Sequence, residues 1–446
     1  MTVELPATFT VAPLRAPIES VDRTTASARY ARLYLWAAVI ICASYVFEGP
    51  ARYVLLLAHV PSLIYLRDLV AVGLIAFGMS LWMGGERRLF PLVVAVYTLF
   101  LHLFCGVLLL PGIVQPLLGL KVFFTFLFGM AASVAVSERS RELLWLALAA
   151  FVATVGGVLL DAVIEFPWAG QAYESSIATA QISREWSSGG IARLSGFARA
   201  SFDAATIVLI LMVPILASRW HGVWRFALWI VAAATIWLTT TKGALLALIA
   251  LAVWIVLENR ASARRLVAIW VASFATLCLA LPLGATQFGF GVRRSEVAGW
   301  LSSFVERIDF MWPDAIHTWL EHGNVFTGRG LGGIGFAQAG AEWWRYNAAD
   351  NLMIYLMVSF GMFALLYVGV FLWNLPRTFN SDDSRLFFAR CVRGWAVVLF
   401  SYGCTSNMVE QPLMNIVIGV CFGAVMIVFP ANQRERLEVA RPGAAA

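Results

Sequence analysis

Four charged residues in this chain stand out because the stretches around them are strongly apolar. Arg193, Lys242 and Arg307 supply cations, and Asp350 supplies a carboxylate at the start of an apolar run. Guanidinium and ammonium groups bind phosphate oxygens, and arginine does so through two parallel hydrogen bonds. A basic site at the edge of apolar segments therefore fits an anionic substrate that is attached to a lipid.

Each of these residues also has a structural interpretation. Arg193 and its neighbour Arg199 can be solvated loop charges, and the long side chain of Lys242 can carry its charge from an apolar segment to the lipid headgroups. Asp350 can be the N-cap of the helix that follows it, because Asp in that position accepts amide hydrogen bonds. The capping role is compatible with a chemical one.

A glycine-rich stretch precedes Asp350. Gly328, Gly330 and Gly333 match the pattern GxGxxG, but no βαβ unit is predicted around them, so we do not expect a dinucleotide site. We expect instead a tight glycine turn that lets the backbone approach the substrate.

The spacing HxxxEH, formed by His317, Glu321 and His322, lies upstream of the glycines. It matches no established metal site, and we expect neither a metal nor a cofactor. The three residues are reserve candidates for a proton acceptor. The six cysteines lie within apolar runs and form no CxxC pair, which favours packing roles.

The elements that must position these residues are membrane-spanning helices. The chain has 446 residues, 61% of them hydrophobic and 13% charged, and it contains repeated apolar runs of about 20 residues, the length that crosses a hydrocarbon core. Continuous apolar runs without alternation favour helices over a barrel. The predicted spans are 33–48, 63–83, 89–110, 114–136, 143–164, 202–217, 223–240, 243–257, 266–285, 350–373, 391–409 and 413–429.

These spans predict an all-α polytopic membrane domain of about 12 transmembrane helices over residues 33–430. Polar tails flank the domain at 1–32 and 431–446, and the first tail lacks the apolar core and the cleavage site of a signal peptide. Two long loops, 165–201 and 286–349, interrupt the spans.

The second long loop is expected to contain two helices. Val297 to Ile308 has the apolar spacing of an amphipathic helix at the membrane interface, and a short helix is expected from Pro313 to about Gly323. Five tryptophans of this loop either stack on sugar rings or anchor it at the interface, and the anchoring role is favoured. They are Trp300, Trp312, Trp319, Trp343 and Trp344.

The placement of arginine predicts the orientation. The net charge of +6 comes with 30 Arg and 2 Lys, and with the N-terminus inside, 20 of these 32 cations lie in short inner loops and tails, as the positive-inside rule requires. We therefore expect both termini in the cytoplasm and the two long loops on the outer side, together with the residues discussed above. Because the arginines punctuate apolar segments, we expect no nucleic-acid partner.

In their order along the chain, the motifs resemble those of the O-antigen ligase and Wzy-type polysaccharide polymerase superfamily. The resemblance covers most of the chain and implies a GT-C-like, metal-independent, inverting glycosyltransferase of the bacterial inner membrane. Such proteins move an oligosaccharide from undecaprenyl diphosphate to an acceptor hydroxyl in the periplasm. The residues that carry the resemblance are Arg193…Gly196-Phe197, Thr239 to Leu246, Arg307…Trp319…Gly328-Arg329-Gly330-Leu331-Gly332 and Asp350-Asn351-Leu352…Gly361.

The chain departs from the family pattern in two of these motifs. Thr241-Lys242-Gly243 replaces the frequent Ser-Arg-Gly, which keeps the charge but loses the bidentate geometry. Asp350-Asn351 replaces the His-Asn or His-Ser that is typical of ligases, and this favours a polymerase. We therefore expect polymerisation of undecaprenyl-diphosphate-linked repeat units into a surface polysaccharide or exopolysaccharide.

Two alternatives stay open. One is an O-antigen ligase that transfers polysaccharide to a lipid A core. The other is a flippase or transporter of the same lipid-linked sugar, which is disfavoured because transporters are commonly built from pseudo-symmetric halves and no internal repeat is evident here.

The resemblance implies roles for particular residues. Arg307 and Asp350 are the expected catalytic residues, since Arg307 can stabilise the charge of a leaving diphosphate and Asp350 can accept or orient the proton of the attacking hydroxyl. Expected partners are the lipid-linked glycan, membrane lipid, and proteins of chain-length regulation and export. The expected substrate-binding residues are Arg193, Arg199, Lys242, Arg329 and Asn351.

Overall fold

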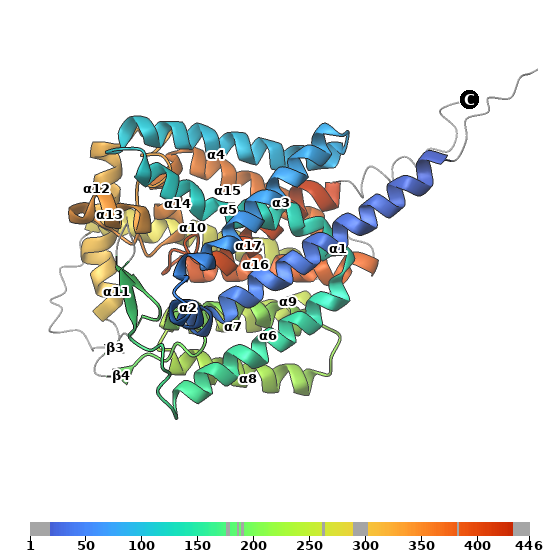
Figure 1. Ribbon diagram of the computed structural model, residues 1–446, viewed down its shortest axis with the longest axis horizontal. Helices are drawn as coiled ribbons and strands as arrows, with labels where there is room; N and C mark the ends of the chain where they lie inside the picture. The colour runs from blue at the N-terminus through green and yellow to red at the C-terminus, as the bar shows by residue number, and fades with distance from the viewer. Residues whose placement is uncertain are drawn as a thin grey trace, which may run out of the picture.

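The computed structural model describes residues 18–174, 179–184, 187–188, 191–260, 264–288, 302–380 and 383–430. In this part of the chain, helices lie side by side in one bundle, and α1 extends beyond it at its N-terminal end (Figure 1). The predicted tail 431–446 lies outside the described residues. The predicted tail 1–32 overlaps α1, because this helix begins at Ile18.

Apolar helices make up the bundle. Six of them are long and apolar enough to cross a membrane, or seven if the bent pair α1–α2 counts as one span, and the protein is a helical membrane protein. The six are Pro61–Met83, Arg87–Leu109, Val114–Glu138, Arg141–Asp161, Arg265–Gln287 and Arg385–Gly403. Shorter apolar helices are Ser201–Ala217, Gly222–Leu238, Phe363–Phe379 and Pro412–Val428.

Each predicted apolar run falls on one or more helices. The α-helices of the bundle are α1 (Ile18–Val46), α2 (Glu48–Leu57), α3 (Leu66–Met83), α4 (Phe90–Leu109), α5 (Val114–Glu138), α6 (Ser140–Asp161), α7 (Ser201–Ala217), α8 (Gly222–Leu238), α9 (Lys242–Glu258), α10 (Arg264–Phe288), α14 (Leu352–Phe360), α15 (Phe363–Asn374), α16 (Asp383–Gly403) and α17 (Pro412–Gly423). Tighter or wider helical turns extend them at η1 (Pro61–Tyr65), η2 (Arg87–Leu89), η7 (Leu375–Asn380) and η8 (Ala424–Val428).

The run 350–373, predicted as one span, is broken into α14 and α15. Gly361 lies at the break with φ 60°, and a Cβ at this position would overlap the backbone of Phe326. The helix therefore stops where only glycine can adopt the backbone conformation and leave room for the neighbouring chain.

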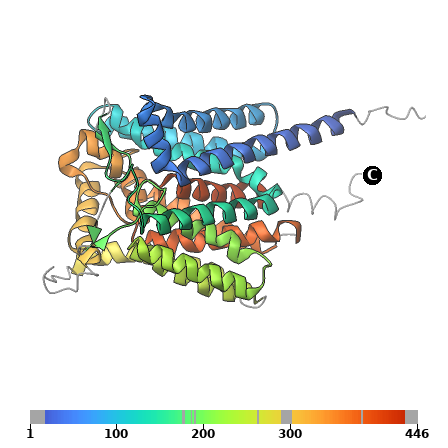
Figure 2. The ribbon, with the colours of Figure 1, turned by 60° about the horizontal axis from the view of Figure 1, so that its bottom comes forward.

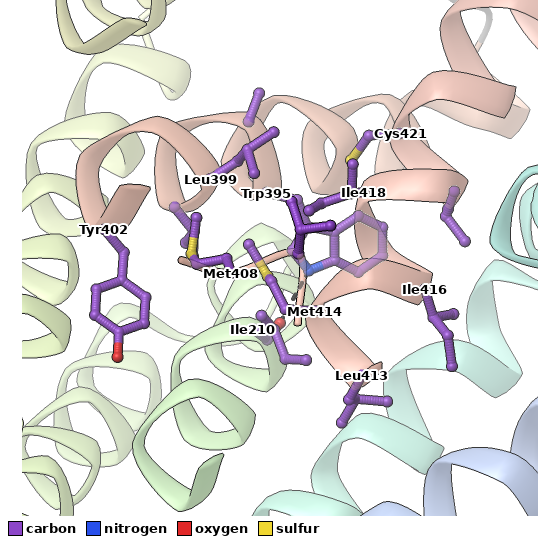
Figure 3. Packing of buried hydrophobic residues seen from close by; sticks show 14 of the residues in the cluster. Ile210, Trp395, Leu399, Tyr402, Met408, Leu413, Met414, Ile416, Ile418 and Cys421 are labelled. Carbon is purple, nitrogen blue, oxygen red and sulfur yellow. Dashed lines mark hydrogen bonds between the residues drawn. The ribbon is translucent and has the colours of Figure 1, made fainter. Parts of the chain in front are cut away.

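The helices α5 and α17 cross in close contact at the centre of the bundle. A Cβ at Gly129 of α5 or at Gly419 of α17 would overlap the backbone of the facing helix, so small residues set the distance between the two. In the buried cluster near this crossing, the indole N–H of Trp395 donates to the Ile210 carbonyl at 2.9 Å (Figure 3). That bond satisfies the polar atom of a large apolar side chain.

One end of the bundle carries long polar segments. We call it the loop end and define it as the described residues among 162–200, 302–351 and 404–411. Two short antiparallel pairs belong to its first segment, β1 (Ala172–Glu174) with β2 (Thr179–Gln181) and β3 (Ser187–Ser188) with β4 (Ile191–Ala192). Figure 2 shows these strands beside the helices of the second segment.

The second segment begins with a continuous helical rod rather than two separate helices. Its parts are α11 (Ser302–Glu306), the π-helical turn η4 (Arg307–Met311) and α12 (Trp312–His322). Pro313 lies in the first turn of α12, and the helix ends next to Gly323, as predicted. Residues 289–301, which include the first five residues of the predicted amphipathic helix, lie outside the described residues, and its remainder lies in α11 and η4. The segment continues with η5 (Gly335–Ala337), α13 (Gln338–Ala341) and η6 (Trp343–Arg345).

The glycine-rich stretch is folded into the protein. Residues 328–335 are buried, and Gly328, Gly330 and Gly332 have φ values of 73°, 82° and 85°. A Cβ at Gly330 would overlap the backbone of α4, and one at Gly332 would overlap the backbone of α5. The predicted tight turn is present, but its glycines make room for two helices of the bundle.

Candidate functional site

Three cations from distant parts of the chain meet at the loop end. Arg193 follows strand β4, Lys242 is the first residue of α9, and Arg307 is the first residue of η4. The charge of Arg307 acts on both Arg193 and Lys242, and the charge of Arg193 acts on Lys242. The structure therefore brings together three residues that are far apart in the sequence. We call Arg193, Lys242, Arg307 and the adjoining Asp350 the cationic site.

The backbone next to Arg193 is fixed by Asp161 at the end of α6. One carboxylate oxygen of Asp161 accepts hydrogen bonds from the amides of Ser195 and Gly196, both at 2.9 Å. Gly196 has φ 59°, and a Cβ there would overlap the backbone of Gly157. The turn therefore requires glycine, and it anchors Arg193 to the bundle.

Lys242 is presented by a threonine turn at the N-terminus of α9. Thr240 has φ 56° within this turn, and the Lys242 side chain is exposed. Gly243 lies so close to the 404–411 loop that a Cβ would overlap the hydroxyl of Thr405. The first turn of α9 therefore packs against this loop, and its unpaired amides add a positive partial charge beside Lys242.

Arg307 forms an ion pair with Asp350. Its Nε and Nη2 lie 3.0 and 2.8 Å from Oδ2 of Asp350, and its Nη1 donates to the Ser303 carbonyl at 3.1 Å. The two side chains are 21% and 31% exposed, so a ligand can reach the pair from solvent. π-Helical turns such as the one that carries Arg307 are frequent at functional sites.

Asp350 stands on strained backbone just before α14. Ala349 and Asp350 have φ values of 62° and 41°, in the left-handed region that residues other than glycine rarely adopt. The N-cap of α14 is Asn351, whose side chain accepts the amide of Ile354 at 3.0 Å. The capping role considered for Asp350 thus belongs to its neighbour, which leaves the Asp350 carboxylate to Arg307.

The cationic site has a net positive charge, with three cations and one carboxylate. Partial burial, and then the nearby charge of Arg307, lower the pKa of the Arg193 guanidinium from its ordinary value. Because arginine keeps its proton at neutral pH, the neighbouring cations repel one another. An anion with several oxygens, such as a diphosphate, relieves this repulsion and matches the donor groups.

Two residues expected to bind substrate lie inside the protein instead. Arg329 is 1% exposed, and its guanidinium donates to both carboxylate oxygens of Glu342 at 2.9 and 3.0 Å and to the Gly333 carbonyl at 2.6 Å. Asn351 is fully buried and donates to carbonyls of α10 and of the 404–411 loop at 3.0 and 3.2 Å. Burial and these hydrogen bonds give both side chains structural roles, and binding of substrate by them stays a prediction.

Arg199 belongs to a different group of charges. Burial lowers the pKa of its guanidinium, and the nearby carboxylate of Glu48 opposes this effect. Glu48 also accepts hydrogen bonds from Arg52 at 2.8 Å and from Arg67 at 3.1 Å. Because Glu48 begins α2, where the chain bends by 82° away from α1, this group of charges stabilises the bend.

The reserve candidates lie at the other end of the helical rod. His317 and Glu321 form an exposed pair at 3.1 Å, and His322 lies 3.8 Å from Glu321. A rise of about 1.5 Å per residue places Glu321 about 20 Å from Arg307 along the rod. Within the described ranges, no group of three or more His, Cys, Asp or Glu residues is placed to hold a metal ion.

The tryptophans of the second loop divide into two kinds. Trp312 and Trp319 are core residues with 0% and 5% exposure, which gives them a packing role. Trp343 and Trp344 are 71% and 60% exposed, and their rings lie edge to face with centroids 6.0 Å apart. Stacking on sugar rings and anchoring at the membrane interface both stay open for these two residues. Trp300 lies outside the described residues.

Glu410 is a loop-end residue that sequence reasoning missed. It lies between α16 and α17, and its Oε1 accepts the amide of Phe336 at 2.6 Å. Burial raises the pKa of Glu410 to about 7, although the Phe336 amide and Arg184 act in the opposite direction, and nearby Asp350 adds to the rise. The predicted topology already placed the turn after residue 409 on the outer side, and Glu410 is its acidic residue.

No protein-family model matches the chain, and no curated protein matches it either.

Proposed function

We propose that this chain is a glycosyltransferase of the bacterial inner membrane that polymerises undecaprenyl-diphosphate-linked repeat units on the periplasmic face. The observation that carries the proposal is the meeting of Arg193, Lys242 and Arg307 beside Asp350 at one end of a helical membrane bundle. Cationic donors in this position fit a substrate whose diphosphate lies at headgroup level while its polyprenyl tail lies in the lipid.

The proposal includes a topology with more spans than the six or seven long helices. We take each of the twelve predicted apolar runs as one span of a GT-C-like domain, with both termini in the cytoplasm. The distribution of arginine over the short loops supports this orientation. With it, the loop end faces the periplasm, where chain-length regulation and export proteins would meet the product.

In the proposed reaction, an acceptor hydroxyl attacks the anomeric carbon of the lipid-linked sugar, and the bond from that carbon to the diphosphate oxygen breaks. Arg193, Lys242 and Arg307 would stabilise the negative charge that develops on the departing diphosphate. Asp350 fixes the Arg307 guanidinium and orients the attacking hydroxyl. Attack from the face opposite the leaving group inverts the anomeric centre.

Repeat-unit polymerisation in cells that lack the native gene tests the proposal. We expect Arg307→Ala and Asp350→Asn each to abolish long-chain polymer at normal membrane abundance. Arg139→Ala is the matched control, because Arg139 also forms a half-exposed ion pair, with Glu142 at 3.0 Å, away from the loop end. Normal polymer length from both test variants would rule the assignment out.

Purified protein in liposomes separates the proposed enzyme from a flippase and from a ligase. Lipid-linked repeat units alone are expected to become joined into longer glycans. Movement of the lipid-linked sugar across the bilayer without a new glycosidic bond would instead indicate a flippase. Product that forms only after a lipid A core is added would indicate a ligase.

A further inference from the structure

The backbone of Gly335 and Phe336 lies in close contact with the carboxylate of Glu410. Its Oε1 accepts the Phe336 amide at 2.6 Å, and a Cβ at Gly335 would overlap the same carboxylate. Gly335 also has φ 79°, so the backbone that faces Glu410 is one that glycine alone adopts without strain. The 404–411 loop and η5, which are distant in the sequence, are thus closely packed at this carboxylate.

The charged and titratable groups that face Glu410 come from three further segments. They are Arg184, Asp350 with the nearby Tyr346, and Tyr355 of α14. Among the described residues, no lysine or arginine forms an ion pair with Glu410, whereas Asp350 is held by Arg307 at 2.8 Å. Of these two neighbouring carboxylates, one is therefore committed to a guanidinium and the other accepts a backbone amide.

This environment suits a group that exchanges a proton near neutral pH. A general base is most effective when its pKa lies near the working pH. Burial raises the pKa of Glu410 to about 7, so its carboxylate is partly ionised at neutral pH and takes up a proton readily. A desolvated carboxylate with a perturbed pKa and a defined charged neighbour is a candidate for a functional group.

Two residues that interact with this carboxylate have exposed aromatic side chains. Phe336, which donates its amide to Glu410, is 50% exposed, and Tyr346, on which Glu410 acts electrostatically, is 51% exposed. Aromatic side chains are enriched at interfaces, where one part of the ring is covered and a polar group stays in contact with water. Flat rings of this kind bind the apolar faces of sugars, while the polar edges of the sugar stay free for hydrogen bonds.

Building on the proposed function, we propose that Glu410 is the catalytic base that takes the proton of the acceptor hydroxyl, and that Phe336 and Tyr346 bind the acceptor sugar. In this step the acceptor oxygen forms a bond to the anomeric carbon while its proton passes to a Glu410 carboxylate oxygen. The bond from the anomeric carbon to the diphosphate oxygen breaks, and that oxygen keeps the electron pair. The site then has a donor half with three cations and an acceptor half with Glu410, and Asp350 lies between them.

Turnover of purified protein in liposomes, measured from pH 5.5 to 8.5, tests this proposal. We expect Glu410→Gln to lower turnover about 10²- to 10⁴-fold, the range for a general base, and to remove the rise of activity near pH 7. Since glutamine keeps an oxygen for the Phe336 amide and resembles the protonated acid, folding should be preserved, which melting temperature and monodispersity in detergent report. Glu142→Gln, at an exposed pair away from the loop end, is the matched control.

Further variants keep the outcomes distinct. Glu410→Asp is expected to retain part of the activity and to displace the midpoint of its pH dependence, which a purely structural role would not produce. Phe336→Ala is expected to raise the KM for the acceptor more than it lowers kcat. If the wild-type protein polymerises normally and the turnover of folded Glu410→Gln is within threefold of the wild-type turnover, the role of Glu410 is overturned. The proposed function would then stand. Wild-type protein that joins no glycans would overturn the proposed function and this inference together.

Discussion

Two arginine–carboxylate pairs in this protein show how differently one interaction can be used. Arg393 and Glu258, 1% and 0% exposed, are joined through two guanidinium nitrogens at 2.9 and 2.5 Å, and Arg393 also donates to the Thr378 carbonyl at 2.6 Å. Arg307 and Asp350 are 21% and 31% exposed and share a single carboxylate oxygen, with Arg193 nearby. The first pair is closed to ligands and joins α9 to α16. The second is open and lies among further cations, which are the properties of a binding site.

The largest expected effect comes from the buried pair. Glu258→Gln leaves Arg393 as a buried cation without its counter-charge, and breaking a buried pair in this way costs about 3–5 kcal/mol of stability. We expect a large fall in melting temperature and in membrane abundance. A melting temperature equal to that of the wild type would show that the pair does not stabilise the contact between α9 and α16.

The open pair should show the reverse behaviour. Arg307→Ala is expected to lower turnover about 10²- to 10³-fold, the typical effect of removing one electrostatic donor, and to change stability by less than about 1 kcal/mol. Turnover in liposomes and melting temperature in detergent measure the two effects on the same preparation. Loss of stability comparable to that of Glu258→Gln would erase the distinction between the pairs.

A pH series sharpens the comparison for the acceptor half. The pKa of Glu410 is about 7 in the folded chain against an ordinary value of 4.5, so between these values the folded state binds a proton that the unfolded state has lost. Stability therefore falls as the pH rises from about 4.5 to 7, while activity, which needs the ionised carboxylate, rises through about pH 7. The difference in melting temperature between wild type and Glu410→Gln checks the first trend. Equal pH dependence of the two proteins would contradict it.

The smallest effect is expected at the exposed pair on α12. His317 and Glu321 are 69% and 51% exposed, and pairs of this kind contribute about 0–1 kcal/mol. Glu321→Gln should leave both melting temperature and polymer length unchanged. A large loss of activity would return Glu321 to the candidates for the proton acceptor.

The helices could be predicted because hydrophobic length is a local property of the sequence. Each predicted run coincides with helical structure, and the run that breaks at Gly361 contains the glycine that breaks it. The cations Arg193, Lys242 and Arg307 could be grouped because the order of the apolar runs and the positive-inside rule put all three on one side of the membrane. The sidedness and the number of spans are still predictions.

The roles of several other residues could not be predicted because they depend on contacts between distant segments or on the local backbone conformation. Arg329 has the sequence surroundings of a loop cation, yet Glu342, 13 residues later, encloses it in a buried pair. Asp350 and Asn351 are neighbours with similar side chains, and the backbone conformation decides which of them caps α14. Glu410 lies in a short turn, and its carboxylate is held by the backbone amide of Phe336, 74 residues away.

The π-helical turn η4 limits which mutations this protein can accept in evolution. Such a turn corresponds to one residue inserted into a regular helix, and the insertion lies at Arg307–Met311, directly before α12. Deletion of a single residue from 308–311 would restore regular winding and rotate Arg307 by about 100° relative to the packed face of α12, away from Asp350. The register of one short helix thus decides whether the cationic site is assembled, so that insertions and deletions here are far less tolerable than substitutions on the exposed side of the same rod.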